Sequence, residues 1–284
     1  MSDKDHVIPF DRLPPGFAET VKHIPDEPVP TRPAATILLL RDGPTGMETL
    51  MLRRTRRSGF VPGAWVFAGG RVDAGDGEDG IAERLTGLTH DEAALRLGLR
   101  PSTIDSPPAI AFYAAALREA FEETGILVAE RADGSAVPSA GEDPEAGAVR
   151  DRLLADEIDF GETLDLLGAH IDASRIEYVA HWITPVQEPR RYDTRFFAAK
   201  VDPAREFALS PSEMSEGRWL TPEDALALHT AGELPMVFPT IRTLEDFCGF
   251  QSVDESLESF GAKPVPAILP RLVVTPTGVG LEVD

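Results

Sequence analysis

The chain has 284 residues, enough for one large domain or two modest ones, and 42% of them are hydrophobic, as in an ordinary folded protein. Its 27 basic residues stand against 48 acidic ones, and the net charge of -21 disfavours nonspecific binding to nucleic acid or to anionic membranes. One cysteine excludes an intramolecular disulfide, no apolar stretch approaches the ~20 residues that span a bilayer, and the start lacks a signal peptide's apolar segment. A cytoplasmic protein is expected.

The first third of the chain predicts an arm and then short strands. Residues 1–33 are rich in proline and charge, which is typical of an extended surface arm. Apolar runs at 34–40 and 48–52 flank the turn Asp42-Gly43-Pro44 and predict a β-hairpin. A strand at 65–67 leads into Gly69-Gly70, and the polar, glycine-containing stretch 75–108 is predicted to be an insertion with a short helix near 90–97.

The remainder of the chain mixes helices and strands. Apolar residues at three- and four-residue steps predict a helix over 109–124, and Gly125 is a natural stop for it. After a loop at 131–146 and helical residues to about 168, the pattern predicts strands at 178–184, 195–201, 217–220 and 271–275, with helices at 222–229 and 239–247. We therefore expect an α+β domain over 34–250 and an extension, 251–284, packed on the same domain.

Three glutamates on the helix at 109–124 are the strongest chemical signal. Glu119, Glu122 and Glu123 stand at positions i, i+3 and i+4, which share one face of a helix. Three carboxylates so close repel one another, and a hard divalent cation such as Mg²⁺ or Mn²⁺ removes that repulsion by taking oxygen ligands. The alternative is a solvated acidic face in an acid-rich chain. The opposite face is apolar, and the upstream Gly69-Gly70 turn follows a strand, which favours the metal site.

The run Arg118-Glu119-x-x-Glu122-Glu123-x-Gly125-Ile126 resembles the core of the box that defines the Nudix family. That box opens with a glycine, five residues and an acid, which are matched here by Gly70 and Asp76. The chain departs from the family pattern in having Asp76 for glutamate, which is expected to weaken its salt bridge, and Ala68 for a proline. In addition, 41 residues instead of seven separate Asp76 from Arg118.

The interrupted box is similar to that of the Nudix branch that includes the peroxisomal coenzyme A diphosphatases. The segments 59–67, 181–185 and 191–197 also resemble that branch, so the resemblance covers roughly residues 33–250. It implies a Nudix-type α/β/α sandwich around a mixed sheet, with an insertion inside the box at about 75–108 and extra C-terminal helices.

The resemblance also implies roles for individual residues. Glu119, Glu122, Glu123, the backbone at Gly69 and the loop residue Glu216 are expected to hold the metal ion. Glu119, Glu122 and Arg118 are expected to be catalytic, with Arg118 holding the helix through a carboxylate. Glu119 is the first choice of general base, and Glu213 or Glu216 is the alternative.

Arginines stand out in so acidic a chain and are candidates for binding phosphate. Arg54, Arg57 and Arg195 are the predicted substrate contacts, because guanidinium groups match phosphate oxygens. For each of them the alternative is a solvated salt bridge. His181, in a predicted strand, is expected to be a hydrogen-bonded strand histidine and not a ligand.

These features predict a divalent-metal-dependent hydrolase of a nucleoside diphosphate derivative, with coenzyme A or acyl-coenzyme A as the leading substrate. Its expected partner is a small nucleotide-diphosphate substrate, and a homodimer is left open. The alternatives are an ADP-ribose or dinucleotide diphosphatase, or a ligand-sensing module on the same fold. Sensing modules typically lose box glutamates, and all three are present here.

Overall fold

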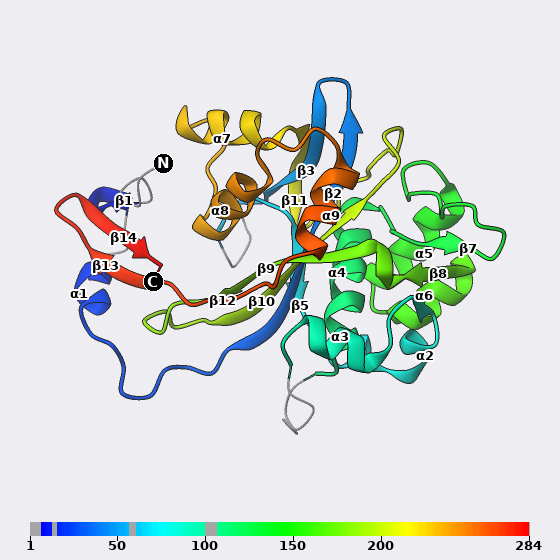
Figure 1. Cartoon of the computed structure of the whole chain (residues 1–284), viewed down its shortest axis with the longest axis horizontal. Helices are drawn as coiled ribbons and strands as arrows, with labels where there is room; N and C mark the ends of the chain where they lie inside the picture. Colours follow the sequence, from blue (N-terminus) through cyan, green and yellow to red (C-terminus); the bar gives the residue numbers. More distant parts are fainter. Residues whose placement is uncertain (1–6, 13–15, 57–60, 100–106, 284) are drawn as a thin grey trace.

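An eight-stranded mixed sheet runs through the middle of the molecule and separates two groups of helices (Figure 1). The computed structural model describes residues 7–12, 16–56, 61–99 and 107–283. The strand order is β11-β3-β2-β10-β9-β12, with β4 beside β3 and β5 beside β2. The strands are β2 (Arg32–Gly43), β3 (Gly46–Arg54), β4 (Trp65–Val66), β5 (Ala68–Arg71), β9 (Ile176–Ile183), β10 (Tyr192–Lys200), β11 (Met214–Leu220) and β12 (Ala267–Ile268).

Strand β2 shows why this sheet lies between two cores. Successive side chains of a strand point to opposite faces, and β2 is apolar on both. Ile37 and Leu39 enter one buried cluster, while Leu38 and Leu40 enter the other. The β2–β3 hairpin confirms the predicted one, and the parallel pairing of β2 with β10 makes the sheet mixed.

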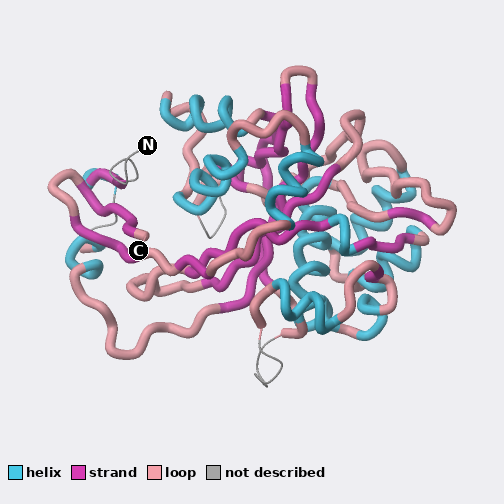
Figure 2. Tube along the Cα trace, viewed as in Figure 1, coloured by secondary structure: helices cyan, strands magenta, loops and turns pink. Residues whose placement is uncertain are grey.

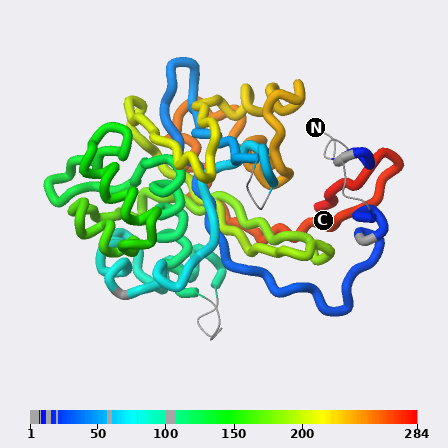
Figure 3. The backbone as a smooth tube through the Cα atoms, turned by 180° about the vertical axis from the view of Figure 1, so that it is seen from behind, coloured from blue at the N-terminus to red at the C-terminus, as the bar shows by residue number. Residues whose placement is uncertain are grey.

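The two faces of the sheet carry different sets of helices (Figures 1 and 3). Helix α4 lies against β2 and β5 with the other helices of the central chain segment around it, and the C-terminal helices cover the opposite face. The first set is α2 (Asp79–Ala82), α3 (His90–Arg96), α4 (Ala109–Thr124), α5 (Pro144–Leu154) and α6 (Phe160–Leu167), and the second is α7 (Pro222–Thr230), α8 (Phe238–Phe247) and α9 (Val253–Gly261).

Helix α4 has the bounds that the sequence predicts. It follows Pro108 and ends at Gly125, whose left-handed backbone (φ 72°) lets its N–H donate to the carbonyl of Phe121. Nearly every side chain of α4 is buried, including those of Arg118, Glu119 and Glu123. Charged groups are therefore buried in this core, and the spacing of apolar residues along the helix does not by itself predict their burial.

The insertion folds onto the domain instead of standing apart from it. It contains the 3-10 helix η3 (Ala74–Gly77), α2, the short strand β6 (Leu85–Thr86) and α3, which packs on α4. Strand β6 pairs in parallel with β8 (Ala169–Asp172), which also pairs with β7 (Glu130–Arg131). These short pairings join segments far apart in the sequence, so local patterns do not predict them.

The two ends of the chain meet in a second small sheet. Strand β1 (Val7–Pro9) pairs with β14 (Gly278–Glu282), which pairs with β13 (Arg271–Val274), and α1 (Phe17–Val21) packs beside them. Residues 22–31 run from this sheet to β2 without helix or strand (Figure 2). In the described part of the chain, no helix is both long enough and apolar enough to cross a bilayer.

Candidate active site

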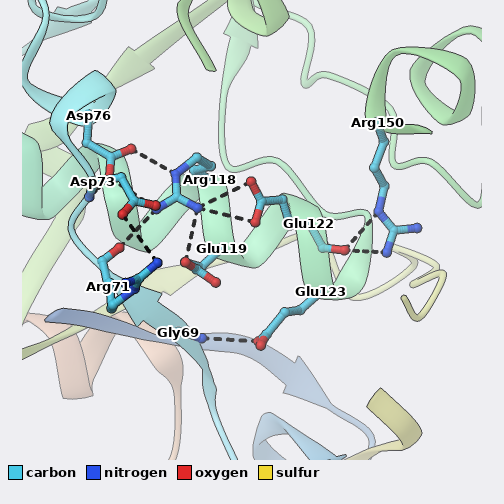
Figure 4. Close-up of polar contacts among 9 residues, drawn as sticks. All are labelled: Gly69, Arg71, Asp73, Asp76, Arg118, Glu119, Glu122, Glu123 and Arg150. Atoms are coloured by element: carbon cyan, nitrogen blue, oxygen red, sulfur yellow. Dashed lines mark hydrogen bonds and ion pairs between the residues drawn. The ribbon is translucent and has the colours of Figure 1, made fainter. Parts of the chain in front are cut away.

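Two glutamates of α4 lie against the glycines of β5: Glu119 lies beside Gly70, and Glu123 contacts Gly69 (Figure 4). Glu119 and Glu123 are buried, with Glu123 only 1% exposed, and Glu122 is half-buried. The N–H of Gly69 donates to Glu123 Oε2 at 3.1 Å. A Cβ at Gly70 would occupy the space of the Glu119 carboxylate, so glycine lets this carboxylate lie against the strand.

Arg118 connects the two halves of the interrupted box. Its Nε and Nη2 donate to the two carboxylate oxygens of Asp76 at 2.8 and 3.1 Å, and Nη2 also donates to the carbonyl of Arg71 at 2.9 Å. Nη1 donates to Glu119 at 3.0 Å and to Glu122 at 3.2 Å. One guanidinium therefore ties the loop after β5 to the helix that carries the glutamates (Figure 4).

The shorter acid at position 76 still forms a complete salt bridge. Asp76 is 1% exposed, binds Arg118 through both oxygens, and accepts a hydrogen bond from the N–H of Asp73 at 2.7 Å. A two-pronged guanidinium–carboxylate pair is the strong form of this interaction. Aspartate at this position, in η3, therefore reaches Arg118 with both oxygens.

Electrostatics at the three glutamates favours a bound cation. Burial raises the pKa of Glu119 to about 7 although Arg118 acts in the opposite direction. Burial also raises the pKa of Glu122, and burial together with the charge of Glu119 raises that of Glu123 well above its ordinary value. In each case the cost of burying the ionised carboxylate exceeds the compensation from the neighbouring arginine.

The donor set fits a hard divalent ion in chemistry. Carboxylate oxygens are the ligands that Mg²⁺ and Mn²⁺ prefer, and a 2+ charge would balance the acids that Arg118 alone does not. Within the described residues, no three acidic, histidine or cysteine side chains already converge on one point. Since Nη1 of Arg118 touches both Glu119 and Glu122, a cation would require these side chains to turn from Arg118 toward it.

The C-terminal turn of α4 is held by parts of the chain distant in sequence. A helix leaves its last four carbonyls without partners inside the helix. Here the carbonyl of Phe121 accepts from Gly125, that of Glu122 from Arg150 of α5, that of Glu123 from Ser210 at 3.0 Å, and that of Thr124 from Ala208 at 2.7 Å. We call the Arg150 side chain and the N–H groups of Ser210 and Ala208 the carbonyl clamp.

Glu213 is electrostatically coupled to the three glutamates. Glu213 follows the clamped segment, and its charge contributes to the raised pKa of Glu119, Glu122 and Glu123. Its own backbone carbonyl accepts from the N–H of Thr55 at 2.8 Å. Glu216, predicted as a metal ligand, instead binds Arg218 at 2.8 Å and Arg53 at 3.5 Å, and it is not among the leading causes of those three shifts.

The three predicted phosphate-binding arginines have different surroundings. Arg54 acts on Glu123 through its charge, which lowers the pKa of that carboxyl. Arg57 lies outside the described residues. Arg195 is 4% exposed, and its guanidinium pairs with Asp193 and lies over the ring of Phe112 at 4.7 Å. The structure thus places Arg195 inside the core instead of in an open cleft.

Some residues of the site have no signal in the sequence. Arg150 stands 28 positions from Glu122, and Asp73 lies in the loop that leads to Asp76. Both are ordinary charged residues in their local context. His181 is hydrogen-bonded to Asp193 at 2.6 Å within the sheet, which confirms that it is a satisfied strand histidine.

Comparisons with known proteins identify the family. A family model described as the NUDT19 Nudix domain matches residues 31–246. The chain is 29% identical over 248 residues to the Gallus gallus protein named acyl-coenzyme A diphosphatase NUDT19, covering 75% of this chain and 64% of that one. It is 26% identical over 269 residues to the Homo sapiens protein of the same name, covering 82% and 70%.

A solved structure agrees with these relatives. The crystal structure of a NUDIX hydrolase from Alicyclobacillus acidocaldarius is 28% identical, with a TM-score of 0.67, and the match covers 83% of this chain and 99% of that one. The predicted α+β Nudix fold is thereby confirmed, as is the resemblance to the branch with an interrupted box. The chain belongs to the NUDT19 Nudix domain family.

Proposed function

We propose that this protein is a divalent-metal-dependent diphosphatase whose substrate is coenzyme A or an acyl-coenzyme A. The observation that carries the reaction class is the cluster of three glutamates on α4: Glu123 binds the N–H of Gly69, Glu119 lies against Gly70, and Arg118 binds Glu119 and Glu122. Relatives named acyl-coenzyme A diphosphatase support the choice of substrate. The products would be adenosine 3′,5′-bisphosphate and a 4′-phosphopantetheine derivative.

Glu119, Glu122 and Glu123 would hold the cation, Mg²⁺ or Mn²⁺. When bound, it supplies positive charge to the diphosphate oxygens and acidifies a coordinated water. Arg118, fixed by its bond to Asp76, holds Glu119 and Glu122 beside the site, and both carboxylates would turn from it to reach the ion. The N–H of Gly69 fixes one oxygen of Glu123, and the other remains for the ion.

Glu213 is the better candidate for the base that takes the proton of the attacking water. It is exposed, so it can return a proton to solvent, and it is electrostatically coupled to all three glutamates. Glu119, the first choice from the sequence, is already engaged by Arg118 and is needed for the ion. Water attacks one phosphorus, the bridging P–O bond breaks, and the proton passes to the Glu213 carboxylate.

Arg54 would contact the substrate on the Glu123 side. Its charge lies near Glu123 on β3, the strand that pairs with the end of β11 close to Glu213. A guanidinium there would bind a phosphate oxygen and offset the repulsion from a protein of net charge -21. Local capture of this kind is required because the overall field repels an anionic substrate.

A substrate panel tests the proposal. Purified protein with Mg²⁺ or Mn²⁺ is incubated with coenzyme A, acetyl-coenzyme A, ADP-ribose and a diadenosine polyphosphate, and products are identified by mass spectrometry in ¹⁸O-labelled water. Coenzyme A and its thioester should be cleaved fastest, with one ¹⁸O in a product phosphate. Glu123→Gln should abolish cleavage, while Glu258→Gln, an exposed acid on α9, should leave it unchanged.

Two other outcomes have distinct meanings. Cleavage of ADP-ribose or the dinucleotide without cleavage of coenzyme A would keep the reaction class and overturn the substrate. Metal binding without cleavage of any compound would favour the ligand-sensing alternative.

A further inference from the structure

Arg150 is a buried cation without a carboxylate partner among the described residues. Its residue is 6% exposed, and its Nε and Nη2 both donate to one backbone oxygen, the carbonyl of Glu122, at 3.1 and 2.6 Å (Figure 4). Arginine is rarely so buried unless it is paired with an acid, because removing the charge from water costs free energy. A carbonyl at the negative end of a helix is the compensation it receives here.

The bonded carbonyl belongs to the turn that carries two of the three glutamates. The carbonyls of Glu122 and Glu123 are held by neighbouring members of the carbonyl clamp, Arg150 and Ser210. The two clamping segments are also joined to each other, since Glu142, just before α5, accepts from the N–H of Glu206 at 2.9 Å. The clamp thus links α5, the segment at 206–210 and the end of α4.

We propose that Arg150 is a positioning residue for the divalent cation, which sets the directions of the Glu122 and Glu123 carboxylates by fixing the backbone between them. The inference rests on the proposed function only in assigning those carboxylates to a metal. Arg150 is the one member of the clamp that acts through a side chain, so substitution can remove it selectively. Groups that orient metal ligands typically change metal affinity or activity by about 10- to 100-fold when they are removed.

A purely structural role makes a different prediction. If Arg150 only stabilised the packing of α5 on α4, its loss would lower the melting temperature while the folded protein kept its affinity for metal. Metal affinity of the folded fraction therefore separates the two roles.

The experiment compares Arg150→Met and Arg150→Lys with Arg152→Met on the same helix. Arg152 is exposed, and its nearest acid in the described structure is Glu157 at 3.9 Å. Arg152→Met is therefore a matched control that also removes one arginine from α5. Binding of Mn²⁺ alone is measured by electron paramagnetic resonance on the full chain, and kcat and KM are measured with coenzyme A. Arg150→Met should weaken Mn²⁺ binding and lower kcat by about 10- to 100-fold, with KM changed less than about threefold. Arg152→Met should match the wild type.

Chemical rescue keeps the inference testable if Arg150→Met fails to fold. Arg150→Ala is assayed with and without added methylguanidinium, and Arg150→Lys retains a charge with a different donor geometry. Restored Mn²⁺ affinity with methylguanidinium, and an intermediate affinity for Arg150→Lys, would support the role. Unchanged Mn²⁺ affinity in any folded Arg150 variant would overturn it. If wild-type protein binds Mn²⁺ but cleaves no substrate, the proposed function fails while the Mn²⁺ comparison still judges Arg150.

Discussion

The cores on the two faces of the central sheet differ in side-chain composition. On the face of α7–α9 the core is apolar and aromatic, with Phe247 stacked on Phe260 at 4.4 Å and Trp182 edge-on to Phe238 at 5.6 Å. On the face of α4, charged groups are buried among the apolar ones, including Asp76, Arg118, Glu119, Glu123 and Arg150.

This difference assigns most of the stability of the fold to one face and the candidate active site to the other. Apolar burial stabilises a fold by about 25 cal/mol per Å², whereas enclosing unpaired carboxylates opposes folding. The α7–α9 face therefore anchors the sheet, and the α4 face holds acids in a state that a cation would relieve. Substitutions on the two faces should accordingly change different measured quantities.

The largest expected effect is on turnover, from Glu119→Gln on the α4 face. Loss of this carboxylate should lower kcat by about 10²- to 10⁴-fold, because the cation loses a ligand. The metal-free protein should be as stable as the wild type or more so, since the variant has no buried charge at this position. Activity assays and urea unfolding in EDTA check both parts. A variant that kept turnover would show that Glu119 is not part of the site.

On the opposite face, Phe247→Ala should give the reverse pattern. Removing a buried phenyl ring from the stack with Phe260 should lower the free energy of unfolding by about 3–5 kcal/mol. Turnover per folded molecule should stay within about twofold at a temperature where the variant is folded. A large loss of kcat in folded protein would mean that the two faces are coupled.

The stability of the metal-free protein should depend on pH through the α4 face. Burial raises the pKa of Glu119 to about 7 from 4.5, so between these values the folded chain holds a proton that the unfolded chain has lost. Stability in EDTA should therefore fall by about 2 kcal/mol as pH rises from 5 to 8, and saturating Mg²⁺ should reverse the fall. Urea melts of wild type and Glu119→Gln isolate this contribution. Equal slopes for the two proteins would contradict it.

The smallest expected effect distinguishes two loop acids at the edge of the site. Glu213→Gln should lower kcat by about tenfold or more, because it removes the proposed base. Glu216→Gln should change kcat by less than about threefold, since its carboxylate is engaged by Arg218 and Arg53. Pre-steady-state cleavage of coenzyme A measures both, and the opposite ranking would restore Glu216 to the site.

Much of the architecture follows from local patterns. The strand formed by the apolar run at 34–40, the turn after it, and the helix ending at Gly125 all lie where the sequence predicts them. The shared face of the three glutamates follows from helix periodicity alone. These features depend on residues that are close together along the chain, so they can be predicted from a single sequence.

Only the tertiary structure shows which residues distant in sequence contact one another. Asp76 reaches Arg118 across the insertion, and Arg150 reaches the carbonyl of Glu122 from another helix. Arg195, a candidate phosphate ligand by residue type, is enclosed over Phe112, and the charge of Glu213 acts on Glu119. The type of a charged residue and its spacing from other residues indicate which groups it can bind. Which partner it contacts depends on how separate helices and strands pack. With 48 acidic and 27 basic residues, the sequence contains many possible ion pairs that local patterns do not distinguish.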